Sequence, residues 1–134
     1  ILNVKLAHID RYTQKRKEVA DFYDLNLSDT PFLKIPVRVS YSTHVFHQYT
    51  IRVSGGKRDA LRTYLNEHGV GSEVYYPIPI HQQSFYVSDL GYKDSLPETE
   101  KAALEVLSLP VHAALSPSDL ETIVSAVNDF TVAN

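Results

Sequence analysis

The chain has 134 residues, of which 43% are hydrophobic and 22% are charged. This length and composition are typical of one folded domain with a sizeable core, and they exclude a disordered chain. The net charge is only −3, from 13 basic and 16 acidic residues. This balance argues against nucleic acid or an anionic membrane as the main partner. No stretch approaches the roughly 18 consecutive apolar residues of a membrane-spanning helix.

The chain contains neither cysteine nor methionine. Without cysteine there are no disulfide bonds, thiolate nucleophiles or cysteine-bound zinc, and the cytoplasm is permitted as the compartment. The sequence opens Ile1-Leu2-Asn3, and no capping residue precedes the helical periodicity that starts there. We therefore expect this chain to be a piece of a longer protein.

The first predicted element is one long helix over residues 1–27. Leu6, Ala20 and Tyr23 belong to a mostly apolar stripe at helical spacing, and the charged residues fall largely off that stripe. The segment 26–31 then ends the helix with turn-forming residues.

Alternating side chains predict a strand over 44–53 and another over 73–76. A short edge strand is predicted over 35–39, where a proline limits hydrogen bonding. Between the two longer strands, residues 57–68 have the pattern of a helix, and Gly69 stands where a left-handed residue would end it.

The last third of the chain begins with an irregular stretch, residues 80–93. Ser95 and Glu98 fit a capping box for a helix through about residue 107. A short buried strand follows over 107–111, and Ser116 has the signature of the N-cap of a final helix. This order of elements predicts an α/β (α+β) two-layer sandwich, with helices on a small, mainly antiparallel sheet.

Motifs for metal or phosphate binding are weak. His44 and His47 lie three apart on a predicted strand, so they point to opposite faces and cannot chelate one metal ion from that strand. Gly55-Gly56-Lys57 lacks the full phosphate-loop pattern, and a strand-to-helix turn explains it. We therefore expect no metal site.

The strongest candidate site is residues 75–83, which read Tyr-Tyr-Pro-Ile-Pro-Ile-His-Gln-Gln. The prolines stiffen the backbone, so the polar tips are held with little entropy left to lose. The tyrosine rings offer stacking surface for a base or sugar, and His81 can donate or accept a hydrogen bond near neutral pH. A proline-rich surface turn whose tyrosines cover the edge of the core has the same pattern. From the residue types alone, both interpretations stay open.

Five blocks of sequence, in this order and spacing, resemble the C-terminal part of the DegT/DnrJ/EryC1/StrS family of pyridoxal-phosphate-dependent nucleotide-sugar aminotransferases. The blocks are His47–Arg52, Arg58–Leu61 with Tyr64-Leu65, Gly69–Gly71, Tyr75–His81 and Leu107–Pro110.

The resemblance implies that residues 1–134 are a single domain, the small C-terminal domain of an aspartate-aminotransferase-like (fold type I) enzyme. Residues 1–27 would be its linking helix and residues 35–134 its sandwich, and the large cofactor-binding domain would be absent.

Such enzymes transfer an amino group, usually from glutamate, to a keto sugar carried on a nucleotide, for cell-surface polysaccharide or related glycans. The resemblance implies a cytoplasmic homodimer that uses pyridoxal 5'-phosphate. The cofactor binds to a lysine of the large domain, and none of the seven lysines here stands in the family's Schiff-base motif. We therefore assign no catalytic or cofactor-binding residue, and we expect this chain alone to bind no cofactor and to be inactive.

The same resemblance implies that Tyr75, Tyr76 and His81 contact the nucleotide-sugar, often across the dimer interface. Position 75 is often histidine in the family, so the tyrosine is a departure there. Two alternatives remain open. The chain is a stand-alone α/β binding module without catalysis, or it belongs to a sensory or regulatory member of the family whose large domain binds cofactor without transamination.

Overall fold

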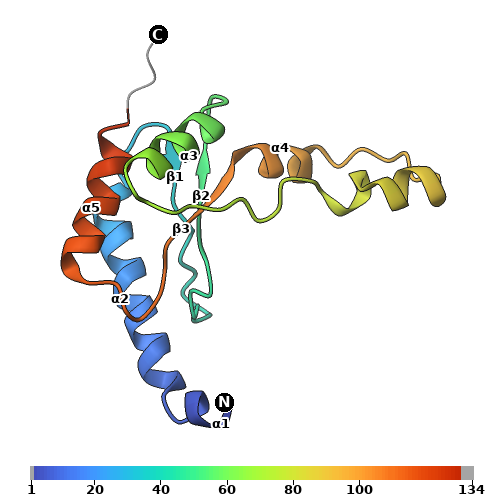
Figure 1. Ribbon diagram of the computed structural model, residues 1–134. Helices are drawn as coiled ribbons and strands as arrows, with labels where there is room; N and C mark the ends of the chain where they lie inside the picture. The colour runs from blue at the N-terminus through green and yellow to red at the C-terminus, as the bar shows by residue number, and fades with distance from the viewer. Residues whose placement is uncertain (1, 131–134) are drawn as a thin grey trace.

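Helices pack against a small antiparallel sheet in the computed structural model, which describes residues 2–130 (Figure 1). Helices α2 and α5 lie on one side of the sheet and α4 on the other. The helices are α1 (Leu2–Leu6), α2 (Ile9–Leu27), α3 (Arg58–Glu67), α4 (Pro97–Glu105) and α5 (Pro117–Asn128), and the strands are β1 (Leu33–Lys34), β2 (Tyr49–Val53) and β3 (Val106–Leu109). This is the predicted α+β fold with an antiparallel sheet.

The sheet has the strand order β1-β2-β3, with both neighbouring pairs antiparallel. Tyr49, Ile51 and Val53 of the central strand are fully buried, whereas Thr50 and Arg52 on the opposite face are half-buried. The buried face packs on one hydrophobic core that α2, α3 and α5 share. The alternation predicted for this strand is therefore confirmed over the residues that are in the ladder.

Three predicted strands were wrong in extent. Residues 35–39 form no strand, because Pro36 has no N–H to extend the ladder beyond β1. The strand predicted over 44–53 begins only at Tyr49, since Phe46 has a φ of 47°, in the left-handed region that a strand does not contain. The segment 73–76 contributes only a bridge between Glu73 and Ser108.

The N-terminal helix is interrupted between α1 and α2, rather than continuous over 1–27. Ala20, Tyr23 and Leu27 of the predicted apolar stripe are fully buried. Leu2 and Leu6, in contrast, are 80% and 67% exposed. The stripe thus packs on the core in its second half only.

The N-terminal ends of the last two helices each depend on an acidic side chain. Ser116 caps α5 as predicted: its Oγ accepts from the Asp119 N–H at 3.2 Å, and Asp119 Oδ2 accepts from the Ser116 N–H at 2.8 Å. The capping box predicted from Ser95 and Glu98 was wrong. Helix α4 begins after Leu96. The capping role predicted for Glu98 belongs to Glu100, whose carboxylate accepts from the Leu96 N–H.

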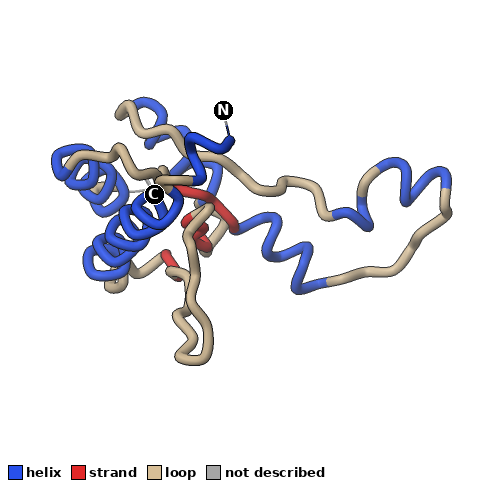
Figure 2. The backbone as a smooth tube through the Cα atoms, turned by 90° about the horizontal axis from the view of Figure 1, so that it is seen from below, coloured by secondary structure: helices blue, strands red, loops and turns tan. Residues whose placement is uncertain are grey.

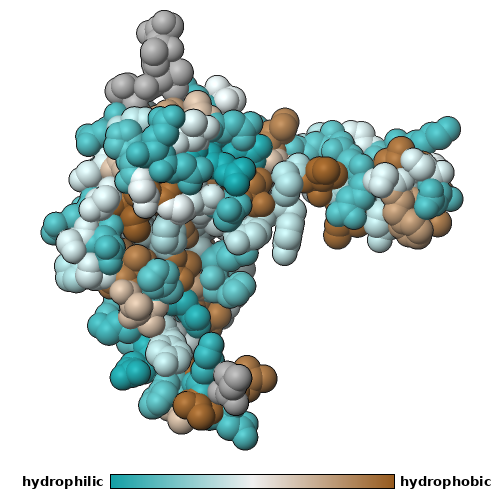
Figure 3. All heavy atoms as spheres, viewed as in Figure 1, coloured by the Kyte–Doolittle hydropathy of each residue, from teal (hydrophilic) through white to brown (hydrophobic). Residues whose placement is uncertain are grey.

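Residues 77–96, which we call the arm, extend away from the sheet and the helices packed on it, which we call the body. The chain leaves the body after the Glu73 bridge and returns into α4. The arm projects well away from the sheet in both views (Figures 1 and 2). The irregular stretch predicted at 80–93 contains a 3-10 turn at Ile80–Gln82 and a π-helical turn at Phe85–Asp89. Hydrophobic side chains are exposed along the arm (Figure 3).

The far end of α4 is fixed to the body by a buried arginine. Arg58, at the start of α3, donates from Nη1 to the carbonyl oxygens of Ala103 at 3.1 Å and Val106 at 3.2 Å. These carbonyls lie where α4 ends and β3 begins, so α3 holds the point at which the returning leg of the arm enters the sheet.

Candidate functional site

Tyr75 and Tyr76 lie at the root of the arm, where the chain leaves the body. Tyr75 is 43% exposed and Tyr76 is 74% exposed, and their ring centroids are 5.7 Å apart. Exposed tyrosine rings at this spacing offer stacking surface without disturbing the core, from which both rings are absent.

The two tyrosines line a hollow of about 450 Å³, which we call the tyrosine hollow. One wall is formed by residues from 75 to 83, at the root and along the outgoing leg of the arm, and the other by α4 with the start of β3. The lining residues are Tyr75, Tyr76, Ile78, Pro79, Ile80 and Gln83 on the first wall, and Thr99, Ala102, Ala103 and Val106 on the second. A mostly apolar, open hollow with aromatic rings suits a flat ring such as a nucleobase.

His81 does not line the tyrosine hollow. Its side chain is only 8% exposed, and its Nε2 lies 3.1 Å from Oε1 of Glu100. Its ring also packs edge-on near Tyr92, with 6.4 Å between the centroids. Of the three predicted site residues, the structure brings Tyr75 and Tyr76 into one hollow and places His81 in a partly buried contact between the outgoing leg of the arm and α4.

A second hollow of about 400 Å³ lies against the sheet and shares Tyr75 with the first. Its lining includes the polar side chains of His47, Gln48, Ser72 and Ser108. Among the described residues, the buried Ser72 Oγ has no hydrogen-bond partner. Sequence reasoning missed Ser72 because an isolated serine before a predicted strand carries no signal of its own.

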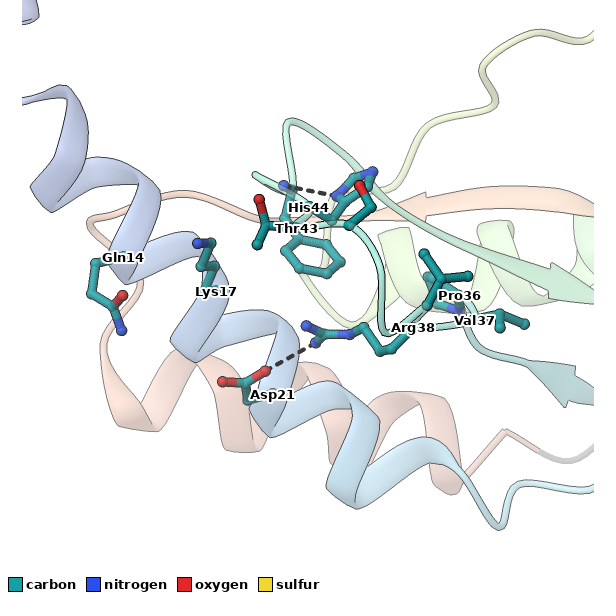
Figure 4. Close-up of a pocket in the computed structure, with 11 residues that line it drawn as sticks. Gln14, Lys17, Asp21, Pro36, Val37, Arg38, Thr43 and His44 are labelled. Carbon is teal, nitrogen blue, oxygen red and sulfur yellow. Dashed lines mark hydrogen bonds and ion pairs between the residues drawn. The ribbon is translucent and has the colours of Figure 1, made fainter.

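A third pocket lies between α2 and residues 36–46 and has a volume of about 400 Å³ (Figure 4). Arg38 in this pocket is paired with Asp21 at 3.0 Å and with Asp24 at 2.6 Å, and its guanidinium lies 4.2 Å from the centre of the Phe46 ring. Since the two carboxylates already balance the charge of Arg38, this pocket is a weaker candidate for an anionic substrate than its basic residues suggest.

The carboxyl group of Glu100, beside the candidate site, accepts three hydrogen bonds that change its pKa. The N–H of Leu96 lowers the pKa of the Glu100 carboxyl below its ordinary value of 4.5, and hydrogen bonds from His81 and Ser95 lower it further. The carboxylate is therefore ionised at neutral pH, and it is a strong acceptor for all three donors.

The lysines do not form a cofactor site by themselves. Five of the seven are exposed, Lys17 and Lys57 are half-buried, and so the described residues provide no enclosed amine for a Schiff base. Within residues 2–130 there is also no group of three or more His, Asp or Glu side chains placed to hold a metal ion. The same described part contains no helix with the length and apolarity to span a membrane. We assign no catalytic step to this chain.

Comparison with known proteins gives a consistent result over nearly the whole chain. The profile of the DegT/DnrJ/EryC1/StrS aminotransferase family matches residues 1–128. The chain is 43% identical to the "Pleiotropic regulatory protein" of Geobacillus stearothermophilus, covering 97% of this chain and 35% of that protein. It is 35% identical to the dTDP-3-amino-3,6-dideoxy-alpha-D-galactopyranose transaminase of Aneurinibacillus thermoaerophilus, covering 97% and 34%. The chain thus spans about a third of the length of these relatives.

Solved structures agree with the sequence comparison. The crystal structure of S. venezuelae DesV in complex with a ketimine intermediate superposes with a TM-score of 0.88 at 31% identity, over 96% of this chain and 34% of that one. NtdA from Bacillus subtilis, solved with the bound cofactor PMP, superposes with a TM-score of 0.76 at 30% identity, over 87% and 27%. The chain therefore belongs to the DegT/DnrJ/EryC1/StrS aminotransferase family.

Proposed function

We propose that this chain is the small, C-terminal domain of a pyridoxal-phosphate-dependent aminotransferase that moves an amino group from glutamate to a keto nucleotide-sugar. The observation that carries the proposal is the family match over residues 1–128 in a chain that spans about a third of its relatives. Relatives named as transaminases of dTDP-sugars support the substrate class. The proposed protein is a cytoplasmic homodimer that serves the synthesis of polysaccharides or related glycans.

In this proposal the chain contributes substrate contacts. Tyr76 is the most exposed ring of the tyrosine hollow and would stack on the nucleotide. Tyr75 lines both this hollow and the polar one beside it, so it would lie between the base and the sugar. His81 completes the predicted binding set, and the hydrogen bond of its buried side chain with Glu100 supports a contribution through the position of the arm.

The cofactor would be held outside residues 1–134. The exposed and half-buried lysines of this chain support that assignment. Accordingly, the chain on its own is expected to bind no pyridoxal phosphate and to transfer no amino group.

The test uses the full-length protein that contains this chain. We expect the purified protein to show a cofactor absorbance band. We also expect it to convert a dTDP- or UDP-linked keto sugar to the amino sugar in the presence of glutamate, with the product detected by mass spectrometry. The variant Tyr76→Ala tests the substrate contact separately: it should keep the cofactor band and lose affinity for the nucleotide-sugar. A protein without cofactor that aminates none of these sugars would contradict the proposal.

A second candidate function is regulatory, and one observation favours it. The relative from G. stearothermophilus, at 43% identity, carries the name of a pleiotropic regulatory protein. A full-length protein that binds cofactor and nucleotide-sugar without turnover would support this alternative. The remaining alternative, a stand-alone binding module, is excluded if the reading frame continues upstream into a lysine-bearing domain.

A further inference from the structure

One carboxylate oxygen of α4 joins the outgoing leg of the arm to the residues just before α4. Oε1 of Glu100 accepts hydrogen bonds from the Leu96 N–H at 2.8 Å, from Ser95 Oγ at 3.0 Å and from His81 Nε2 at 3.1 Å. We call these four residues the clasp. The bonds from Ser95 and Leu96 are local to the start of α4, but the bond from His81 connects residues 19 positions apart.

The clasp joins the two chain segments that form the walls of the tyrosine hollow. His81 directly follows Ile80, which lines the first wall, and Glu100 directly follows Thr99, which lines the second. The His81 side chain is buried although its neighbour Ile80 is 65% exposed. The His81–Glu100 bond therefore links the segments that carry the two walls.

The chemistry of the clasp makes it a strong fixing point. Hydrogen bonds to an ionised carboxylate are stronger than those between neutral groups, and this carboxylate has three donors. If Glu100 only capped α4, the Leu96 N–H bond would be sufficient. The bond to His81, a buried side chain, adds nothing to the helix, so it needs another explanation.

We propose that Glu100 is a positioning residue: by holding His81, it fixes the wall that carries Tyr76 and so sets the affinity of the tyrosine hollow for the nucleotide-sugar. This inference rests on the proposed function for its ligand. It places His81 and Glu100 in one unit, so that removing either member has the same consequence.

The experiment compares variants of the full-length protein with glutamate and a keto nucleotide-sugar. We expect Glu100→Ala and His81→Ala each to raise KM for the nucleotide-sugar by roughly 5- to 20-fold, with the half-reaction with glutamate unchanged. Glu100→Gln keeps an acceptor oxygen and should restore most of the affinity. The matched control is Glu98→Ala, which changes an exposed acidic residue of the same helix turn that makes no side-chain hydrogen bond in the described structure, and it should match the wild type.

The double variant His81→Ala/Glu100→Ala separates positioning from a general structural effect. If Glu100 acts through His81, the double variant has the same KM as the worse single variant, because the second change removes nothing further. Additive effects in the double variant, or an unchanged KM in Glu100→Ala, would overturn the proposal.

A second readout is independent of the reaction. Lys93 is exposed on the returning leg of the arm, so trypsin cleavage after it reports how firmly the arm is held. We expect faster cleavage in Glu100→Ala than in Glu98→Ala, and equal rates would overturn the clasp. If the wild-type protein aminates no nucleotide-sugar, the proposed function fails, while the cleavage rates still decide whether the clasp holds the arm.

Discussion

Tyr49→Phe tests the polar contact that joins the central strand to the long helix. Tyr49 begins β2, its side chain is fully buried, and its hydroxyl donates to Asp24 Oδ1 on α2 at 2.6 Å. The substitution removes this one oxygen and keeps the ring, which packs 5.0 Å from the ring of Tyr23. Burial raises the pKa of the Tyr49 hydroxyl, and the bond to Asp24 raises it further, so the hydroxyl is a neutral donor throughout the working pH range.

The expected loss of stability depends on the interactions that Asp24 retains in the variant. A hydrogen bond to a charged group contributes about 1.5–3 kcal/mol. Asp24 retains its ion pair with Arg38 at 2.6 Å and its side chain is 24% exposed, so water partly replaces the lost donor. We therefore expect the low end, about 1.5 kcal/mol in the free energy of unfolding. With a urea slope of about 2 kcal/mol per M, this loss lowers the unfolding midpoint by roughly 0.7 M.

The assay is urea unfolding followed by circular dichroism, with the slope compared between variants. Tyr41→Phe is the matched control, because Tyr41 is 88% exposed and should show no change. A loss in Tyr49→Phe below about 0.5 kcal/mol, the ordinary range of surface substitutions, would refute the reasoning. So would a comparable loss in Tyr41→Phe.

Three further predictions concern the site, the last helix and the N-terminal surface. Tyr76→Phe in the full-length protein loses one neutral hydrogen bond of about 0.5–1.5 kcal/mol, which raises KM for the nucleotide-sugar roughly 2- to 12-fold; an unchanged KM speaks against a hydroxyl contact. Hydrogen bonds from the Ser116 side chain and then its N–H lower the pKa of the Asp119 carboxyl, so its stabilisation is present above its ordinary pKa of 3.8 and is lost as the pH falls through the lowered value. Asp119→Asn should therefore lower Tm at pH 7 and make a shrinking difference below pH 3.8, and a pH-independent difference would contradict this. Finally, the exposed Leu2 and Leu6 predict that the isolated chain self-associates, and Leu6→Ser should reduce the mass seen by light scattering; a chain that is monomeric at high concentration excludes this.

The sequence predicted the elements whose signals are local. Ser116, Pro117 and Asp119 specify the start of α5 within four residues, and the structure has the predicted capping box there. Helix α3 lies within the predicted 57–68 range because its apolar spacing and the following Gly69 agree. Such signals need no knowledge of the rest of the fold.

Strand ends were predicted less well, because they depend on partners. Alternation continues back to residue 44, but Phe46 turns into the left-handed region and packs in the core instead of the ladder. Glu73 exchanges two backbone hydrogen bonds with Ser108, and beyond it the chain leaves the sheet edge to form the arm. Neither departure has a signal in the local residue pattern, since each is set by contacts with distant segments.

In the candidate site, too, residues with a local sequence signal were predicted and those that depend on distant contacts were missed. The residue types beside two prolines left a binding site and a surface turn both open, and the family resemblance assigned the tyrosines to the site; the structure places both tyrosines in the lining of one hollow. Glu100 was missed because its role depends on His81, and only the return of the arm brings the two together. The sequence suggested Glu98 as the capping residue instead, two positions before the residue that accepts from the Leu96 N–H.

The arm contributes no residue to the hydrophobic core, so loss of the His81–Glu100 bond should affect substrate affinity more than the stability of the fold. The hydrophobic core of the described chain draws on α2, α3, α5 and the sheet, and it includes no residue of the arm, 77–96. Loss of the Glu100–His81 bond therefore leaves the packing that stabilises the fold intact, while the tyrosine hollow loses the fixed spacing of its walls. A site that is already ordered loses less entropy when it binds. His81→Ala, which breaks this bond and keeps the hydrogen bonds of Glu100 at the start of α4, should consequently weaken substrate affinity at nearly constant Tm, the opposite of the pattern expected for Tyr49→Phe.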